Sequence, residues 1–206
     1  MPPRTFSGWA SAALVVFCWL ALATALDQTL LFDIAIRDMI HSWAGPPLTS
    51  AMRAVTWLGE PDALALLMIV AAWWMVKAGR RRDAFWLAIA TLGALAISEL
   101  LKLVFHRARP AAFFGYVDPS TYSFPSGHAT VSCCFYGLLA AFLTARMKSH
   151  AVRIALWIGS AALVLAIGFS RIYLGVHYAS DVVGGYALGI FWVVVARKVS
   201  FRAGIE

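Results

Sequence analysis

The chain has 206 residues, of which 62% are hydrophobic and only 13% are charged, and its formal net charge is +7. Soluble globular domains contain about a quarter charged residues, so this composition excludes them and indicates an integral membrane protein. The apolar residues form continuous runs, which favours membrane helices over the alternating pattern of a β-barrel. Polytopic membrane proteins collect Lys and Arg on one side for topological reasons, so the charge does not imply a nucleic-acid partner.

Six apolar runs follow one another along the chain, and each predicts a membrane-spanning helix. The first ends in Ala23-Thr24-Ala25, which resembles a signal-peptidase site, but the run is longer than a usual signal core and we interpret it as an uncleaved span. The sequence therefore predicts an all-α polytopic membrane protein in which residues 1–206 form one domain with six transmembrane helices. The runs cover residues 9–26, 63–76, 84–98, 129–145, 154–169 and 182–196.

The segment between the first two runs mixes apolar and charged residues. Within it, residues 31–43 place two aspartates and an arginine among apolar side chains, which is typical of a short helix lying in the membrane interface. Gly45-Pro46-Pro47 is expected to end this helix. His41 has no partner at a useful spacing, so we interpret it as an interfacial side chain.

Lysines and arginines cluster after the second, fourth and sixth apolar runs. With six helices, these clusters share one side of the membrane with Arg4, and the excess of positive charge in cytoplasmic loops identifies that side as the cytoplasm. Both termini are then expected in the cytoplasm. The clustered residues are Lys77, Arg80, Arg81, Arg82, Arg146, Lys148, Arg153, Arg197, Lys198 and Arg202.

Three short polar stretches are assigned to the opposite, outer side of the membrane. The first is KLVFHRARP, residues 102–110, in which Lys102 and Arg109 lie seven residues apart on one helical face and Pro110 ends the helix. Both cations would then point toward the outer surface. Taken alone, the stretch is also typical of a snorkelling lysine with interfacial arginines.

The second stretch is PSGH, residues 125–128, at the head of the fourth apolar run. Its proline presets the first helical turn, Ser126 can cap the helix, and Gly127 allows a ligand to approach the N–H groups at the helix start. Anions bind well to such groups, and His128 stands beside them. By itself, the pattern is equally typical of a helix cap without a ligand.

The third stretch is SRIYLGVHYASD, residues 170–181. His177 and Asp181 are four residues apart, so on a helix the carboxylate can accept the proton of ring Nδ1 and leave Nε2 as a lone-pair donor. A histidine prepared in this way serves as a nucleophile or a base. Arg171 offers a planar fork of donors for phosphate or carboxylate oxygens. The alternative is a surface loop with an incidental helix pair.

Chain lengths bring the three stretches to the same face of the membrane. Residues 129–169 suffice for two crossings, and the 14 residues between Pro110 and Pro125 form a simple outer loop. Together the stretches provide three cations, helix N–H groups, two histidines and one carboxylate. Such a set favours chemistry on an anionic group.

The stretches read KxxxxxxRP, PSGH and SRxxxxxHxxxD, which resembles the complete signature of the type 2 phosphatidic acid phosphatase superfamily. Members of this family are six-helix lipid phosphate phosphatases whose catalytic core is related to the helical fold of the vanadium haloperoxidases. The resemblance spans Lys102 to Asp181. It implies an enzyme that needs neither a metal ion nor another cofactor.

The resemblance also implies a role for each signature residue. His177 would attack phosphorus and form a phosphohistidine, Asp181 would hold its tautomer, and His128 would protonate the leaving oxygen and later activate water. The remaining residues would hold the non-bridging phosphate oxygens as charge builds in the transition state. They are Lys102, Arg109, Ser126, Gly127 through its amide, and Arg171.

The expected substrate is a lipid phosphate at the outer face of a bacterial inner membrane, facing the periplasm or the cell exterior. The outer loop, residues 107–124, is short and aromatic, which leaves little room for a large sugar head group such as that of lipid A. Arg107, a cation beyond the signature, is expected to meet a second phosphate. We therefore predict hydrolysis of undecaprenyl diphosphate to undecaprenyl phosphate, with phosphatidic acid and phosphatidylglycerol phosphate as alternative substrates.

Two other classes of protein fit the pattern less well. A transporter would show internal repeats or polar residues at mid-membrane, whereas the polar residues here gather at helix ends on one face. A haloperoxidase is disfavoured because that chemistry suits soluble proteins. Transfer of the phosphate to another lipid stays open as an alternative reaction, since the same pocket serves it, and so does the oligomeric state.

Overall fold

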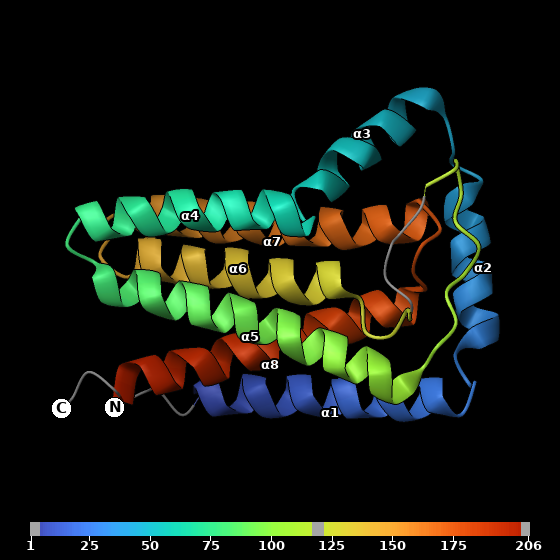
Figure 1. Ribbon diagram of the computed structural model, residues 1–206, viewed down its shortest axis with the longest axis horizontal. Coiled ribbons are helices and arrows are strands. Elements are labelled where there is room, and N and C mark those ends of the chain that lie inside the picture. Colours follow the sequence, from blue (N-terminus) through green and yellow to red (C-terminus); the bar gives the residue numbers. More distant parts are fainter. Residues whose placement is uncertain (1–4, 117–121, 203–206) are drawn as a thin grey trace.

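The computed structural model describes residues 5–116 and 122–202, which form eight helices and no strand (Figure 1). Two helices lie at one end of the molecule, α2 (Leu30–His41) across that end and α3 (Pro46–Trp57) projecting from it. The other six lie side by side in one bundle. They are α1 (Thr5–Ala25), α4 (Pro61–Lys77), α5 (Arg81–Phe105), α6 (Gly127–Thr144), α7 (His150–Tyr173) and α8 (Ala179–Arg202).

Five of the described helices are long and apolar enough to cross a membrane by themselves, namely α1, α5, α6, α7 and α8. Together α3 and α4 meet the same criterion as a sixth span, which bends by 52° between its two helices. The prediction of an all-α membrane protein with six spans is therefore confirmed. The second span differs from the prediction because it is a bent pair of helices.

The helices extend beyond the apolar runs that predict them. α5 has 25 residues, whereas its run covers residues 84–98. The added turns carry charged side chains that pair along the helix, and Lys102 Nζ lies 2.6 Å from the carboxylate of Glu99. Residues three apart share a helical face, so the helix carries both charges without interruption.

Glycines on α8 let it approach α6 closely where both helices begin. A Cβ atom on Gly185 would lie 2.7 Å from the carbonyl oxygen of Ser126, and one on Gly189 would lie 2.7 Å from the Cβ atom of Cys133. The Ser126 amide donates to the carbonyl oxygen of Asp181 at 3.0 Å. Two of the three predicted polar stretches thus touch through their backbones.

The segment between α1 and α4 contains two helices where the sequence predicts one. α2 ends at His41, and Pro46 then begins α3, because proline fits the first turn of a helix. Gly45-Pro46-Pro47 therefore starts a helix in addition to following one. The ring of His41 stacks on Phe113 of the outer loop with centroids 3.7 Å apart, and its interpretation as an interfacial side chain stays a prediction.

The outer loop between α5 and α6 is described up to Tyr116 and again from Tyr122, and residues 117–121 lie outside the described residues. Its aromatic side chains pack against the protein. Phe114 stacks on Tyr173 of α7, with ring centroids 5.5 Å apart. These contacts anchor the described part of the loop to the helices at the α2 end of the bundle.

Candidate active site

The three predicted stretches meet around one cavity of about 200 Å³. The helices α6 and α8, which follow two of these stretches, begin at the same end of the bundle, the end that α2 crosses (Figure 1). One wall of this cavity is apolar and comes from α4 and α5, with Leu64, Met68, Leu92 and Leu95. The convergence predicted from chain lengths is therefore present in the fold. The predicted site residues that line the cavity are Lys102, Arg109, Gly127, His128 and His177, and Glu60, Thr91 and Glu99 are also part of its polar lining.

His177 is almost completely buried and lies two residues before α8, not on a helix. Its Nδ1 is 3.3 Å from Oδ2 of Asp181, which stands in the first turn of α8. On the other side of the ring, Arg109 Nη1 donates to Nε2 at 3.2 Å. Because a guanidinium can only donate, Nε2 carries the lone pair and Nδ1 carries the proton. The predicted pairing of His177 with Asp181 is formed, and the contacts on both sides of the ring favour the tautomer that the sequence predicts.

Arg109 reaches this position from a loop and not from the helix that carries Lys102. α5 ends at Phe105, and His106 adopts a left-handed conformation with φ of 49°. The expectation that Lys102 and Arg109 share one helical face is therefore wrong. The chain turns three residues earlier than the proline alone requires, and Arg109 is fixed instead by a 2.9 Å hydrogen bond to the Val176 carbonyl.

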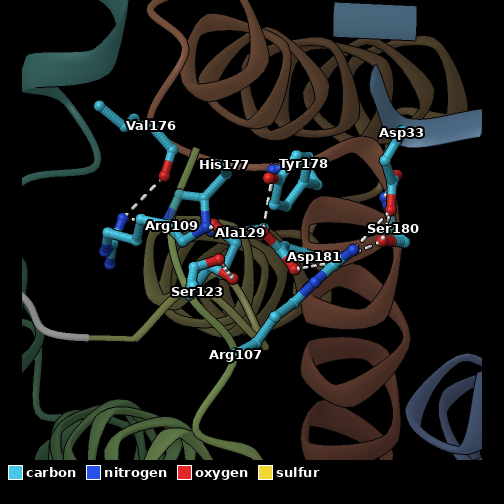
Figure 2. Close-up of polar contacts among 12 residues, drawn as sticks. Asp33, Arg107, Arg109, Ser123, Ala129, Val176, His177, Tyr178, Ser180 and Asp181 are labelled. Atoms are coloured by element: carbon cyan, nitrogen blue, oxygen red, sulfur yellow. Dashed lines mark hydrogen bonds and ion pairs between the residues drawn. The ribbon is translucent and has the colours of Figure 1, made fainter. Parts of the chain in front are cut away.

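Arg107 is not among the residues that line the cavity, and its side chain points toward Asp181 and Ser180 (Figure 2). It donates to Asp181 Oδ1 and, at 2.8 Å, to Asp33 Oδ2 on α2. Burial lowers the pKa of Arg107, but the charges and hydrogen bonds of Asp181 and Asp33 raise it by more, so its pKa lies above the ordinary value. The expectation that Arg107 meets a second phosphate is wrong, because two carboxylates already hold it.

His128 occupies the first turn of α6 and faces a carboxylate that the sequence analysis did not identify. Its Nε2 lies 3.2 Å from Oε1 of Glu60, the residue just before α4. Glu60 Oε1 also lies 3.5 Å from Arg171 Nη1. The carboxylate therefore stands between a histidine and an arginine that both belong to the predicted site.

Arg171 is buried near the end of α7 and is held by the outer loop and α3. Its Nη1 donates to Thr56 Oγ1 at 2.8 Å and to the Tyr116 hydroxyl at 3.0 Å. The Tyr116 hydroxyl in turn donates to Glu60 at 2.6 Å. Burial raises the pKa of Tyr116, and this effect outweighs the lowering by Arg171, so the phenol stays protonated and can make both contacts.

Lys102, Gly127 and Ser126 complete the predicted set. Lys102 is buried, and a Cβ atom on Gly127 would lie only 3.4 Å from its ammonium nitrogen. A glycine at this position therefore leaves room beside the lysine. Ser126 is fully buried and caps α6 by accepting the Ala129 amide at 3.4 Å, as the sequence predicts. Its predicted contact with phosphate stays a prediction.

The site residues that sequence reasoning missed share one property, which is a partner far away in the chain. Asp33 meets Arg107 across 74 residues, and Arg171 meets Thr56 across 115. Neither pair has a local spacing that could predict it. Within residues 5–116 and 122–202, no three His, Cys, Asp or Glu side chains are close enough together to bind a metal ion.

Known proteins resemble the chain in both sequence and structure. A sequence model described as PAP2 superfamily matches residues 83–205. Phosphatidylglycerophosphatase B of Bacillus subtilis (strain 168) is 31% identical over 177 residues, which cover 84% of this chain and 86% of that protein. Decaprenylphosphoryl-5-phosphoribose phosphatase of Mycobacterium tuberculosis (strain H37Rv) is 35% identical over 150 residues, which cover 70% of this chain and 76% of that protein.

A solved structure also matches. The crystal structure of a transmembrane PAP2-type phosphatidylglycerolphosphate phosphatase from Bacillus subtilis superposes with a TM-score of 0.87 and 27% sequence identity. The superposition covers 96% of this chain and 97% of the other. The signature stretches, their common cavity and these matches agree, and the chain belongs to the PAP2 superfamily of membrane phosphatases, which hydrolyse phosphate esters of lipids.

Proposed function

We propose that this protein hydrolyses a lipid phosphate through a phosphohistidine on His177, with residues 1–206 acting as one phosphatase domain. The observation that carries the proposal is the position of His177 between Asp181 and Arg109. The carboxylate takes the Nδ1 side of the ring and leaves the Nε2 lone pair beside a guanidinium. That lone pair can attack phosphorus while Arg109 holds a phosphate oxygen.

The other signature residues supply the proton transfers and the charge. As the bond from His177 Nε2 to phosphorus forms, the bond from phosphorus to the lipid oxygen breaks, and His128 gives that oxygen a proton. His128 then takes a proton from the water that hydrolyses the phosphohistidine. The charge of the transferred group is balanced by Lys102, Arg109, Arg171, Ser126 and the Gly127 amide.

These cationic side chains take the role that a metal ion plays in other phosphatases, so we propose that the reaction is metal-independent. Phosphate release is expected to persist in excess EDTA. Vanadate is expected to inhibit it, because vanadate adopts the trigonal bipyramidal geometry of the transition state. Activity that returns only when Mg²⁺ is added back would contradict this part of the proposal.

The surroundings of the cavity favour a phosphate monoester as the substrate. The cation that favoured a diphosphate, Arg107, is bound to Asp33 and Asp181. The cavity is also lined by two carboxylates, Glu60 and Glu99, which oppose additional negative charge. The names of both relatives describe removal of a phosphate from a lipid head group, which is in line with this preference. We therefore propose a lipid phosphomonoester such as phosphatidylglycerol phosphate.

Undecaprenyl diphosphate is the second candidate, because the apolar wall between α4 and α5 accepts any long lipid chain. A substrate panel in detergent separates the two. We expect kcat/KM for phosphatidylglycerol phosphate or phosphatidate to exceed that for undecaprenyl diphosphate by more than tenfold, or about 1.4 kcal/mol in transition-state binding. The reverse order would favour the diphosphate. If no lipid in the panel is hydrolysed, the proposed function fails.

We also propose that the site faces the periplasm or the cell exterior and that both termini are cytoplasmic, because the basic clusters lie at the opposite end of the bundle. In a background without the native cysteines, exposed Ala44 near α2 and exposed Lys148 between α6 and α7 are each replaced by cysteine. An impermeant thiol reagent is expected to label Ala44→Cys in intact cells and to leave Lys148→Cys unlabelled. The opposite pattern would place the site in the cytoplasm.

A further inference from the structure

The carboxylate partner of His177 is held by an arginine, which a second carboxylate holds in turn, and neither residue takes part in the proposed chemistry. We propose that Arg107 and Asp33 are positioning residues, which fix the charge and direction of Asp181 and thereby the reactive tautomer of His177. The proposal rests on the proposed role of His177 as the nucleophile. It assigns a part in catalysis to α2, which carries Asp33.

Asp181 divides its two oxygens between the histidine and the arginine (Figure 2). Oδ2 lies 3.3 Å from His177 Nδ1 and accepts the Tyr178 amide at 2.9 Å. Oδ1 accepts Arg107 Nη1. A carboxylate held on both oxygens cannot rotate away from the imidazole, so Arg107 sets the direction in which Asp181 faces His177.

Asp33 holds both the arginine and the start of α8. Arg107 Nη2 donates to Asp33 Oδ2 at 2.8 Å, and the guanidinium lies 4.4 Å from the ring centroid of Tyr178. Asp33 also accepts the Ser180 amide at 2.9 Å and the Ser180 hydroxyl at 2.6 Å. These contacts fix the helical turn that carries Asp181. A single carboxylate on α2 thus positions the cation and the helix together.

The charge balance gives Arg107 a role beyond packing. Asp33 and Asp181 are both 0% exposed, and Arg107 lies between them. Without the arginine, two carboxylates would share one buried site, where both cannot stay ionised. An Asp181 that had taken up a proton would lose the negative charge that strengthens its hydrogen bond from His177 Nδ1–H, although a carboxyl oxygen could still accept that proton. The imidazole would then be held less firmly with its lone pair on Nε2.

The first test compares single and double variants of the full chain in detergent, with a lipid phosphate that the wild type hydrolyses. Arg107→Gln is expected to lower kcat roughly 10- to 100-fold, the range found when an outer partner of a metal-binding histidine is lost. KM is expected to stay within about threefold, because the phosphate contacts remain. Adding Asp33→Asn removes the second carboxylate and is expected to recover at least about threefold in kcat.

A pH profile separates positioning from folding. The charged or titratable groups that face Asp181 and its histidine are Arg107 from the outer loop, Asp33 from α2, and Arg109 beside His177. Raising the pH returns the charge of Asp181, so the ratio of kcat in Arg107→Gln to kcat in the wild type is expected to rise about tenfold between about pH 6 and pH 8. The same kcat ratio for the variant that carries both Arg107→Gln and Asp33→Asn is expected to rise less over this pH range.

Arg37→Gln is the matched control, because Arg37 lies on α2 one turn beyond Asp33 and pairs with Asp38 at 3.7 Å. It also donates to the carbonyl of Ala111 and so ties α2 to the outer loop without touching Asp181. This variant is expected to keep kcat within about threefold of the wild type. An equal loss of kcat in Arg37→Gln would show that docking of α2 alone explains the effect, and would overturn the positioning role.

Two other results would overturn it as well. One is wild-type kcat in Arg107→Gln, and the other is a loss of kcat that is the same at every pH and is not recovered by Asp33→Asn. If Arg107→Gln alone fails to fold, the double variant is compared with Asp33→Asn, which keeps the arginine. A different result, full activity in His177→Ala, would contradict the proposed function.

Discussion

The two histidines of the site stand in unlike surroundings. The side chain of His177 is 1% exposed and that of His128 is 13% exposed. Asp181, the partner of His177, is 0% exposed, whereas Glu60 beside His128 is 30% exposed. A group that attacks phosphorus along one line gains from being held, and a group that passes protons between a lipid oxygen and water gains from access. The difference in burial therefore matches the difference in proposed roles.

The charges on the two sides are arranged differently as well. Behind His177, one arginine between two buried carboxylates forms a closed set with no contact to the cavity. Beside His128, the Glu60 carboxylate lines the cavity and lies within 3.5 Å of Arg171. An incoming phosphate must share or displace the contacts of Glu60. We therefore expect the carboxylates and Arg107 behind His177 to keep their contacts when the lipid binds, and the half around His128 to adjust to it.

The largest expected effects come from the histidines themselves. His177→Gln is expected to lower kcat/KM by at least about 10⁴-fold, because no nucleophile remains. His128→Gln is expected to cost less, roughly 10²- to 10³-fold, and to cost little with p-nitrophenyl phosphate, whose leaving oxygen needs no proton. The values of kcat/KM from phosphate release with the lipid and from nitrophenol release with the nitrophenyl ester, both at subsaturating substrate, measure the two effects. Equal losses of His128→Gln on the two substrates would contradict its role as the acid.

A smaller effect is expected at Glu60. Its carboxylate favours the protonated form of His128, so the substitution Glu60→Gln makes that proton easier to lose. The alkaline limb of the pH profile of kcat/KM is therefore expected to shift to lower pH by about one unit. Glu99→Gln is the matched control, because Glu99 also lines the cavity but pairs with Lys102. An unshifted limb in Glu60→Gln, or an equal shift in Glu99→Gln, would remove Glu60 from the acid–base half.

The smallest expected effects compare one hydroxyl from each half. Ser180→Ala removes a buried hydroxyl that donates to Asp33 at 2.6 Å and accepts from Arg107 at 2.8 Å. We expect it to lower the free energy of unfolding by about 1–3 kcal/mol, and Tyr116→Phe, beside the cavity, by less than about 1 kcal/mol. Thermal unfolding in detergent measures both. A larger loss in Tyr116→Phe would contradict the contrast between a fixed and an adjustable half.

Local spacing predicts the contacts that the signature residues make among themselves. The pairing of His177 with Asp181, the cap at Ser126 and the meeting of the three stretches all follow from residues close in sequence or from the number of membrane crossings. The same reasoning fails for Arg107. A cation next to a phosphate signature indicates a phosphate contact until its partner is known, and Asp33 lies 74 residues away on a helix expected only to rest in the interface.

The fold shows the same limit. Apolar runs predict the spans, but they do not predict α3, because Pro46 looks like the end of one helix when it is the beginning of another. Glu60 lies in the break between α3 and α4. Its position beside His128 therefore depends on the 52° angle between these two helices, which no pattern in the sequence specifies. The contact that completes the half around His128 comes from this unpredicted turn, whereas the half around His177 is completed by Asp33 of α2, a predicted helix whose partner in the outer loop was not predicted.

Rapid quench with a radiolabelled lipid phosphate tests the phosphohistidine on His177 most directly. An acid-labile, base-stable adduct is expected to form in the wild type within one turnover and to be absent in His177→Gln. With p-nitrophenyl phosphate, His128→Gln is expected to accumulate the same adduct, because the water that hydrolyses it is no longer activated. An adduct that persists in His177→Gln, or an active wild type that forms none, would contradict covalent catalysis by His177.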